Sequence, residues 1–186
     1  MKVLVGFASR HGSTQGIAAR IGERLAASGI DVAVQRVEDV RETDVEAFDA
    51  FVIGSAAYMG HWLKPATRFV ERHRDALGSH PTWLFSSGPI GPDRTDKQGR
   101  DVLKTSEPRE LGELGADVGS RSNQVFFGAF DPDAPRVGVW ERIGAPFMQM
   151  PAVRDAMPAG DFRDWPAIEA WADEIATALK TPVAVG

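Results

Sequence analysis

The chain has 186 residues, a formal charge of -5 and no cysteine. Hydrophobic residues make up 43% of it and charged residues 25%, a composition typical of one soluble globular domain that disfavours extensive disorder and membrane-spanning helices. The mild acidity disfavours nucleic acid as a partner, and the absence of cysteine excludes disulfides, cysteine-ligated clusters and thiolate nucleophiles, so redox chemistry would need a bound cofactor.

Apolar runs alternate with amphipathic segments in the first half of the chain. Residues 3–8 form an apolar run without polar alternation, which predicts a strand that is covered on both faces. Apolar residues then recur at helical spacing until Ser28-Gly29, where glycine is typical of a helix C-terminus. Two further strands are predicted over 31–37 and 49–54, with an acidic connector between them that should contain a short helix.

The second half continues this alternation with less regular patterns. We expect a helix over 65–78, because proline suits its first turn and glycine suits its end. Strands are predicted over 81–86 and 123–129, with a short helix at 109–114 between them. The last predicted helix covers 164–179 and carries its apolar residues on one face.

Alternating strands and helices predict an α/β fold, in which a five-stranded parallel sheet has helices on both faces. We expect a single domain over 1–180, with an insertion at about 131–163 that a minimal fold does not need, and a frayed tail at 181–186. Because the chain enters its first strand too early for a signal peptide, a cytoplasmic location is expected. In such sheets, ligands bind beyond the carboxyl ends of the strands, where the strand order reverses.

The loop between the first predicted strand and helix has the features of an anion site. Amides at a helix N-terminus favour negative charge, hydroxyls can donate to an anion, and glycine permits close approach of the backbone. The alternative is a plain strand–helix turn whose hydroxyls cap the helix. The spacing lacks the lysine of an ATP-binding P-loop and the glycine pattern of a dinucleotide fold. The loop reads Ser9-Arg10-His11-Gly12-Ser13-Thr14.

Three residues of this loop match the S/T-x-T-G-x-T pattern with which the flavodoxin family wraps the phosphate of FMN. The chain resembles this family, and more closely the subfamily of menaquinone-dependent protoporphyrinogen oxidase, through motifs at 7–14, 52–61 and 164–176. His11 departs from the pattern, because the family has a threonine there. The resemblance implies a flavodoxin-like three-layer sandwich with strand order 2-1-3-4-5 and FMN at its switch point. The matching residues are Ser9, Gly12 and Thr14.

By this resemblance, two further loops would hold the isoalloxazine ring of FMN. The loop after the third strand would contact the ring, with Tyr58 and Trp62 as candidates for stacking on its face. Trp62 would serve equally well as a packing residue of the following helix. The loop after the fourth strand would flank the other side of the ring. The residues expected in the two loops are Ala57, Tyr58, Met59, Gly60, Trp62, Ser87, Gly88 and Pro89.

His61, in the first of these loops, is the candidate catalytic residue. Histidine is the side chain whose charge ordinarily changes near neutral pH, so it could shuttle a proton to reduced flavin or to substrate. The alternative is a histidine that only forms a hydrogen bond with the backbone. The 4 histidines of the chain show no metal-ligand spacing, so we expect no metal.

Three functional hypotheses are considered, and the insertion bears on the choice between them. Four of its apolar residues share a helical face, which would be core or, if exposed beside the flavin, a site for an apolar substrate, a quinone or a membrane surface. The first hypothesis is an FMN-binding flavodoxin-like oxidoreductase, a quinone-linked dehydrogenase that contacts the membrane peripherally without spanning it. The alternatives are an electron-transfer protein that serves redox partners and has no substrate of its own, and a binding protein that has lost FMN. The four residues are Trp140, Ile143, Phe147 and Met150.

Overall fold

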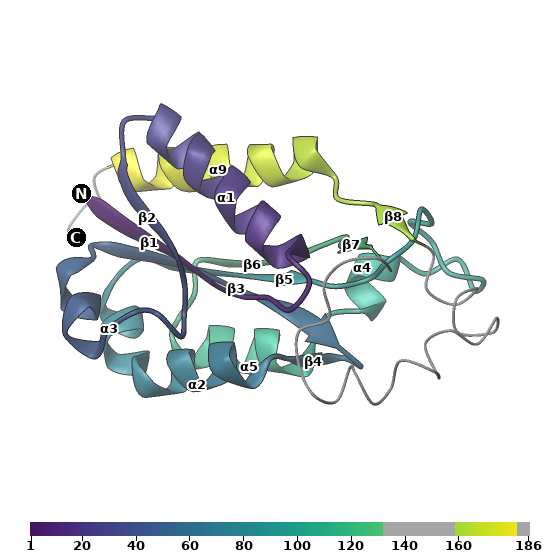
Figure 1. The fold of residues 1–186 in the computed structure, drawn as a ribbon, viewed down its shortest axis with the longest axis horizontal. Coiled ribbons are helices and arrows are strands. Elements are labelled where there is room, and N and C mark those ends of the chain that lie inside the picture. Colours follow the sequence, from purple (N-terminus) through teal and green to yellow (C-terminus); the bar gives the residue numbers. More distant parts are fainter. Residues whose placement is uncertain (132–158, 182–186) are drawn as a thin grey trace.

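The fold is a parallel sheet between two layers of helices (Figure 1). The computed structural model describes residues 1–131 and 159–181. Five parallel strands lie in the order β2-β1-β3-β5-β6, and the short β4 pairs antiparallel with β3. Numbered among themselves, the parallel strands have the order 2-1-3-4-5, which confirms the predicted fold. The strands are β1 (Lys2–Ala8), β2 (Asp31–Arg36), β3 (Ala50–Tyr58), β4 (His61–Trp62), β5 (Thr82–Ser87) and β6 (Ser122–Phe126).

Helices cover both faces of this sheet, as predicted (Figure 1). Two helices lie side by side on one face, namely α1 (Ser13–Ala27) and α9 (Trp165–Lys180). The acidic connector after β2 forms the 3-10 helix η1 (Glu42–Ala47), which confirms the short helix predicted there. The opposite face is covered by α2 (Lys64–Arg72), α3 (Arg74–Ser79) and α5 (Arg109–Asp117).

The first strand divides its apolar residues between two cores. Val3, Val5 and Phe7 pack into the core under α1 and α9, whereas Leu4 and Ala8 belong to the core on the opposite face. All residues of the strand after Lys2 are buried, because both faces of the sheet are covered. This double coverage is why the segment shows no polar alternation in the sequence.

Short elements account for most differences from the predicted structure. The helix predicted over 65–78 is divided at His73, where φ and ψ of -104° and 20° leave the helical region and the ring packs 4.7 Å from that of Phe69. The strand predicted over 123–129 ends at Phe126, because the chain then turns into a separate ribbon. Both β4 and the helix α4 (Val102–Thr105) are too short to leave a periodic pattern in the sequence.

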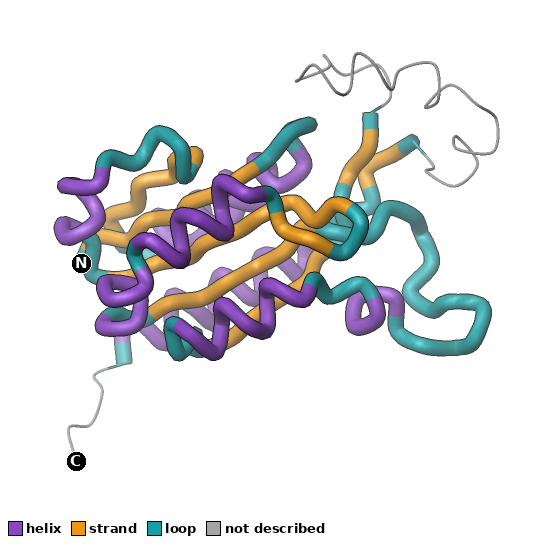
Figure 2. Tube along the Cα trace, turned by 90° about the horizontal axis from the view of Figure 1, so that it is seen from below, coloured by secondary structure: helices purple, strands orange, loops and turns teal. Residues whose placement is uncertain are grey.

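The insertion begins and ends at this two-stranded ribbon, in which β7 (Ala129–Phe130) pairs antiparallel with β8 (Gly160–Asp161). Figure 2 shows the ribbon and the long loop after β5 projecting from the same end of the sheet. Within residues 1–131 and 159–181, no helix combines the length and apolar character that a membrane span requires. Residues 182–186 of the predicted tail lie outside the described residues, as do Trp140, Ile143, Phe147 and Met150.

Candidate functional site

Three strands end at the same level and bring their loops together. In the sheet register, Ala8 of β1 pairs with Ser55 of β3, and Ser55 pairs with Ser86 of β5. The reversal of strand order lies here, because the chain passes from β1 outward to β2 and then back across to β3. The loops after β1, β3 and β5 therefore converge at the position where doubly wound sheets bind their ligands.

The loop after β1 leads into an uncapped helix N-terminus. Gly12 has a φ of 83°, a left-handed conformation that glycine adopts without steric cost, and it precedes the first turn of α1 without a side-chain cap. The hydroxyl of Ser9 accepts a hydrogen bond from the Gly12 amide at 3.2 Å and holds the loop closed. The first turn of α1 contains no acidic residue, so its positive end is available to an anion.

Thr14 carries the most informative atom of this loop. Its side chain is 0% exposed, and its Oγ1 has no hydrogen-bond partner among the residues that the structure describes. A buried hydroxyl without a partner costs about 1–3 kcal/mol, so such atoms are uncommon unless a ligand completes them. A phosphate oxygen at the N-terminus of α1 would accept this hydrogen bond, and the loop therefore fits a phosphate.

Ser13 joins the loop after β1 to two other segments. Its Oγ lies 3.1 Å from the Oγ of Ser87 at the end of β5, and it accepts a hydrogen bond of 2.9 Å from the amide of Ala129 in β7. Gly128 gives this junction its room, because a Cβ there would lie 3.3 Å from the Ser13 hydroxyl. Since the Ala129 amide is the donor, Ser13 keeps its own proton for Ser87 or for a ligand.

Tyr58 connects the loops after β1 and β3. Its ring centroid lies 6.4 Å from that of His11, and the guanidinium of Arg10 lies over it at 5.0 Å. Behind them, Arg36 at the end of β2 donates to the carbonyl of Ser9 at 3.2 Å. Sequence reasoning missed Arg36, whose only signal is its place at the end of the strand beside β1. Tyr58 is half-buried and stays the predicted stacking residue.

A tight hairpin follows β3. Tyr58 pairs with His61, and the two residues between them have positive φ angles, 52° at Met59 and 78° at Gly60. Two positive φ angles are typical of the type I′ turn that joins antiparallel strands, and they are strained for a residue other than glycine or asparagine. The Met59 side chain is 99% exposed at the tip of the turn.

Trp62 belongs to the core and does not face the site. Its side chain is 4% exposed and packs in the same cluster as Ala66 and Phe69 of α2. Its Nε1 is buried without a partner among the described residues. Of the two roles considered for Trp62, the structure supports packing. The indole has almost no accessible face, which argues against the expected stacking of Trp62 on a flavin. Ala57, its partner across the hairpin, is half-buried.

His61 forms a hydrogen bond with a carboxyl group that sequence reasoning did not predict. Its Nδ1 lies 2.7 Å from Oε1 of Glu110, in the first turn of α5. Burial alone would raise the pKa of Glu110, but hydrogen bonds from His61 and from the amides of Glu110 and Trp62 outweigh it and hold this pKa below its ordinary value. In the sequence, Glu110 appears only as one acidic residue near a helix N-terminus.

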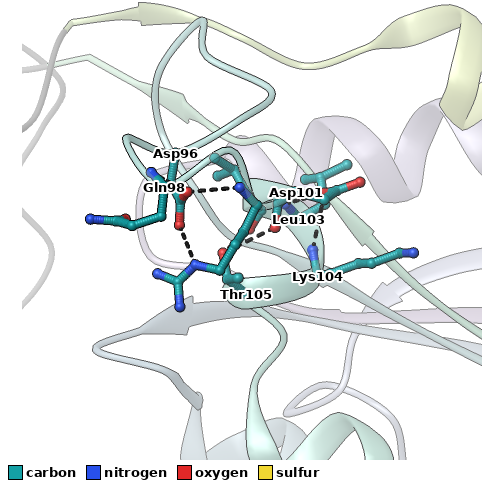
Figure 3. A network of polar contacts seen from close by, with 8 residues as sticks. Asp96, Gln98, Asp101, Leu103, Lys104 and Thr105 are labelled. Carbon is teal, nitrogen blue, oxygen red and sulfur yellow. Dashed lines mark hydrogen bonds and ion pairs between the residues drawn. The ribbon is translucent and has the colours of Figure 1, made fainter.

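The loop after β5 is ordered by its own aspartates (Figure 3). Asp96 accepts hydrogen bonds of 2.9 Å from the amides of Gln98 and Arg100, and the hydrogen bond from the Arg100 amide is the main reason for its lowered pKa. Asp101 caps α4 by accepting from two amides of that helix. These contacts hold the segment before α4 and the start of that helix together. Of the residues predicted in this loop, Ser87 is buried, and Gly88 and Pro89 are half-buried.

The segment after the insertion is anchored to α1. The guanidinium of Arg163 donates to the carbonyl of Ser13 at 3.4 Å and lies 4.4 Å over the ring of Trp165. Gly16 leaves space for this side chain, because a Cβ there would overlap it. Asp161 holds the same guanidinium through both carboxylate oxygens, which lowers the pKa of Asp161. The base of the insertion therefore packs directly beside the phosphate loop.

No metal centre is visible in the part of the chain that the structure describes. Within residues 1–131 and 159–181, no group of three or more His, Asp or Glu side chains is close enough to hold a metal ion. The described residues of the converging loops offer hydroxyls, amides and the half-buried ring of Tyr58. These groups suit an organic cofactor with a phosphate and a flat ring system.

Comparisons with known proteins agree with this geometry. The sequence model of the flavodoxin domain matches residues 4–143. The chain is 34% identical over 86 residues to a protein of Escherichia coli K12 named protoporphyrinogen IX dehydrogenase [quinone], and the match covers 46% of this chain and 48% of that protein. The chain thus spans about half the length of the curated relatives it matches.

Solved structures share the fold at low sequence identity. An archaeal flavodoxin has a TM-score of 0.58 at 17% identity, with 97% of this chain and 100% of that chain covered. A rubredoxin oxygen:oxidoreductase from Desulfovibrio gigas has a TM-score of 0.63 at 14% identity, with coverages of 99% and 37%. A flavodoxin of Streptococcus pneumonia TIGR4 has a TM-score of 0.58 at 17% identity, with coverages of 96% and 99%. The sequence match, the strand order and the phosphate loop agree, and the chain belongs to the flavodoxin-domain family, whose cofactor is FMN.

Proposed function

We propose that this chain is an FMN-dependent oxidoreductase that passes electrons from an apolar substrate to a quinone. The observation that carries the cofactor part is the buried, unpartnered hydroxyl of Thr14 beside an uncapped helix N-terminus. The partial similarity to a protein named as a quinone-dependent protoporphyrinogen dehydrogenase supports the quinone part. Bound FMN would supply the capacity to accept and release electrons that the side chains of this chain lack.

Each loop would have its own task in binding FMN. The amides after Gly12 and the hydroxyl of Thr14 would hold the phosphate, and Ser9 would keep their loop closed. Arg10 and His11, which lie around the Tyr58 ring, would position that ring for stacking. The fixed loop after β5 would exclude water from the other side of the isoalloxazine.

The substrate would approach where the insertion joins the site. The ribbon of β7 and β8 is tied to the phosphate loop through the Ala129 amide and Ser13, so residues 131–163 start and end next to the cofactor. The insertion would hold the substrate or the quinone, or contact a membrane surface peripherally. His61 would serve as the catalytic proton carrier at the rim of the site.

Two measurements test this function in sequence. The fluorescence of FMN should be quenched on titration with the protein, and riboflavin, which lacks the phosphate, should bind at least tenfold more weakly, since about 1.4 kcal/mol already gives that ratio. The FMN-loaded protein should then oxidise protoporphyrinogen IX with menadione as the quinone acceptor. Equal affinities for FMN and riboflavin would contradict the phosphate site. Binding of FMN without any quinone-dependent turnover, together with a stable semiquinone on redox titration, would instead identify an electron-transfer protein.

A further inference from the structure

The His61–Glu110 pair links the hairpin after β3 to the helix beneath it. His61 stands on β4, opposite Tyr58, and its Nδ1 lies 2.7 Å from Oε1 of Glu110 on α5. The two side chains are exposed to different degrees, 66% for His61 and 23% for Glu110. One edge of the imidazole is thus held by the protein, and the ring as a whole faces solvent at the converging loops.

The chemistry of the pair assigns the positions of its protons. An ionised carboxylate only accepts hydrogen bonds, so Nδ1 must carry the proton that is shared with Glu110. Burial opposes the charge of Glu110, but the hydrogen bond with His61 and the position in the first turn of α5 favour the anion, and the pKa of Glu110 lies below its ordinary value. Nε2 is then the nitrogen that is left to accept or release a proton.

Two charged residues of α5, Arg109 and Glu113, stand near Glu110. Arg109, the next residue on α5, is held by Glu113 one turn away through a hydrogen bond of 2.7 Å. Its charge also interacts with Glu110. Across the hairpin, the residue opposite His61 is Tyr58. Glu110 is the carboxyl group that holds Nδ1 of His61.

We propose that Glu110 is a positioning residue, which fixes the Nδ1-protonated tautomer of His61 and so presents Nε2 as the proton carrier at the rim of the cofactor site. This inference rests on the proposed function for the identity of the reaction. The step it assigns is a single proton transfer: Nε2 accepts one proton from a ligand at the hairpin and releases it to water, and no other bond of the protein changes. Glu110 touches neither ligand nor cofactor and acts only through His61.

The tautomer can be observed without any turnover. Nitrogen-15 NMR of the imidazoles, at a pH where the rings are neutral, distinguishes protonated from unprotonated ring nitrogens, and the spectrum of His61→Gln identifies which of the 4 histidine signals is His61. We expect a protonated Nδ1 in the wild-type protein and a shift of that signal toward the unprotonated position in Glu110→Ala. The matched control is Glu113→Ala, which removes a carboxylate of the same helix and should leave the signal unchanged. A wild-type ring protonated at Nε2, or the same tautomer in Glu110→Ala, would overturn the proposal.

Turnover of the FMN-loaded protein distinguishes a role of the His61–Glu110 pair in proton transfer from a purely structural role. His61→Gln should lower kcat by about 100-fold, the lower range of general acid–base effects, and should flatten the pH profile. Glu110→Ala should lower kcat less, leave KM unchanged and alter the same limb of the profile. The double variant should be no slower than His61→Gln, because both residues act on one proton. Additive losses, or a profile unchanged in His61→Gln, would overturn the relay. A protein that binds no FMN would refute the proposed function instead, and the NMR result would still decide whether Glu110 sets the tautomer.

Discussion

Removal of the unpartnered hydroxyl of Thr14 should change the stability of the free and of the FMN-bound protein in opposite directions. Thr14→Val keeps the side-chain shape and removes only the hydroxyl. Without FMN, the loss of a buried unpaired hydroxyl should stabilise the fold by about 1–2 kcal/mol. For a chain of this length, that raises the midpoint of thermal unfolding by about 2–8 °C. With FMN, the same change removes a hydrogen bond to a charged phosphate, worth about 1.5–3 kcal/mol. Together with the stabilisation of the free protein, this weakens binding by about 2.5–5 kcal/mol, which is roughly 70-fold to several thousand-fold.

Thr82 provides the matched control for this experiment. It is also buried in the sheet, but its hydroxyl donates to the carbonyl of Leu77 at 2.7 Å. Thr82→Val should therefore destabilise the fold by about 1–3 kcal/mol and leave FMN affinity unchanged. His11→Ala should weaken FMN binding less than Thr14→Val. Thermal unfolding and fluorescence titration measure these effects. Thr14 would not be the phosphate ligand if Thr14→Val destabilised the protein as Thr82→Val does, or if the Thr14→Val protein bound FMN with wild-type affinity.

Three further predictions concern stability. Gly54→Ala should destabilise the fold by about 3 kcal/mol, because the new Cβ would overlap the buried ring of Phe85. Gly78→Ala on α3 should instead stabilise it by about 0.5–1 kcal/mol, because a Cβ there would make only an ordinary contact of 3.8 Å with the carbonyl oxygen of Val118. Urea titration checks both, and equal effects would contradict the overlap. Met59→Asn should raise stability by about 0.5–1 kcal/mol in the same assay, since asparagine adopts a positive φ more readily, and no gain would show that the turn is unstrained. The fold lowers the pKa of Glu110 from its ordinary 4.5, so the ionised carboxylate contributes fully to the free energy of unfolding above pH 4.5. This contribution is lost as the pH falls through the lower pKa of the folded state. Glu110→Gln should therefore flatten the acid side of the stability–pH profile, and an unchanged profile would refute the assignment.

The sequence predicted the parts of the fold that repeat a pattern over several residues. The buried run at 3–8 and the helical spacing after Ile17 each involve enough residues to show their period. The strand order was predicted only through the resemblance to the flavodoxin family, and the structure confirms it. The loop at 9–14 could be placed in the fold for the same reason, because it lies between two well-patterned elements, and its role in binding phosphate stays a prediction. The hairpin at Met59-Gly60 has only two residues per strand and no such signal.

Contacts between distant residues could not be predicted from patterns. Glu110 meets His61 across 49 positions, and Ala129 meets Ser13 across 116. Each depends on how helices and loops are placed in space, which local propensity does not encode. Trp62 shows the same limit for burial: an aromatic residue in a functional loop was compatible with stacking or packing until the core around it was known.

The packing of α9 against α1 has a consequence for shortened forms of the protein. Ile168, Trp171 and Ile175 of α9 complete the core that supports α1, and with it the turn that carries Thr14. A fragment that stops before the insertion would contain all of the proposed phosphate ligands but would leave the apolar face of α1 exposed to water. The loops that recognise the cofactor and the helix that keeps them folded are far apart along the chain, so a minimal FMN-binding unit cannot be made by trimming the chain from its C-terminal side.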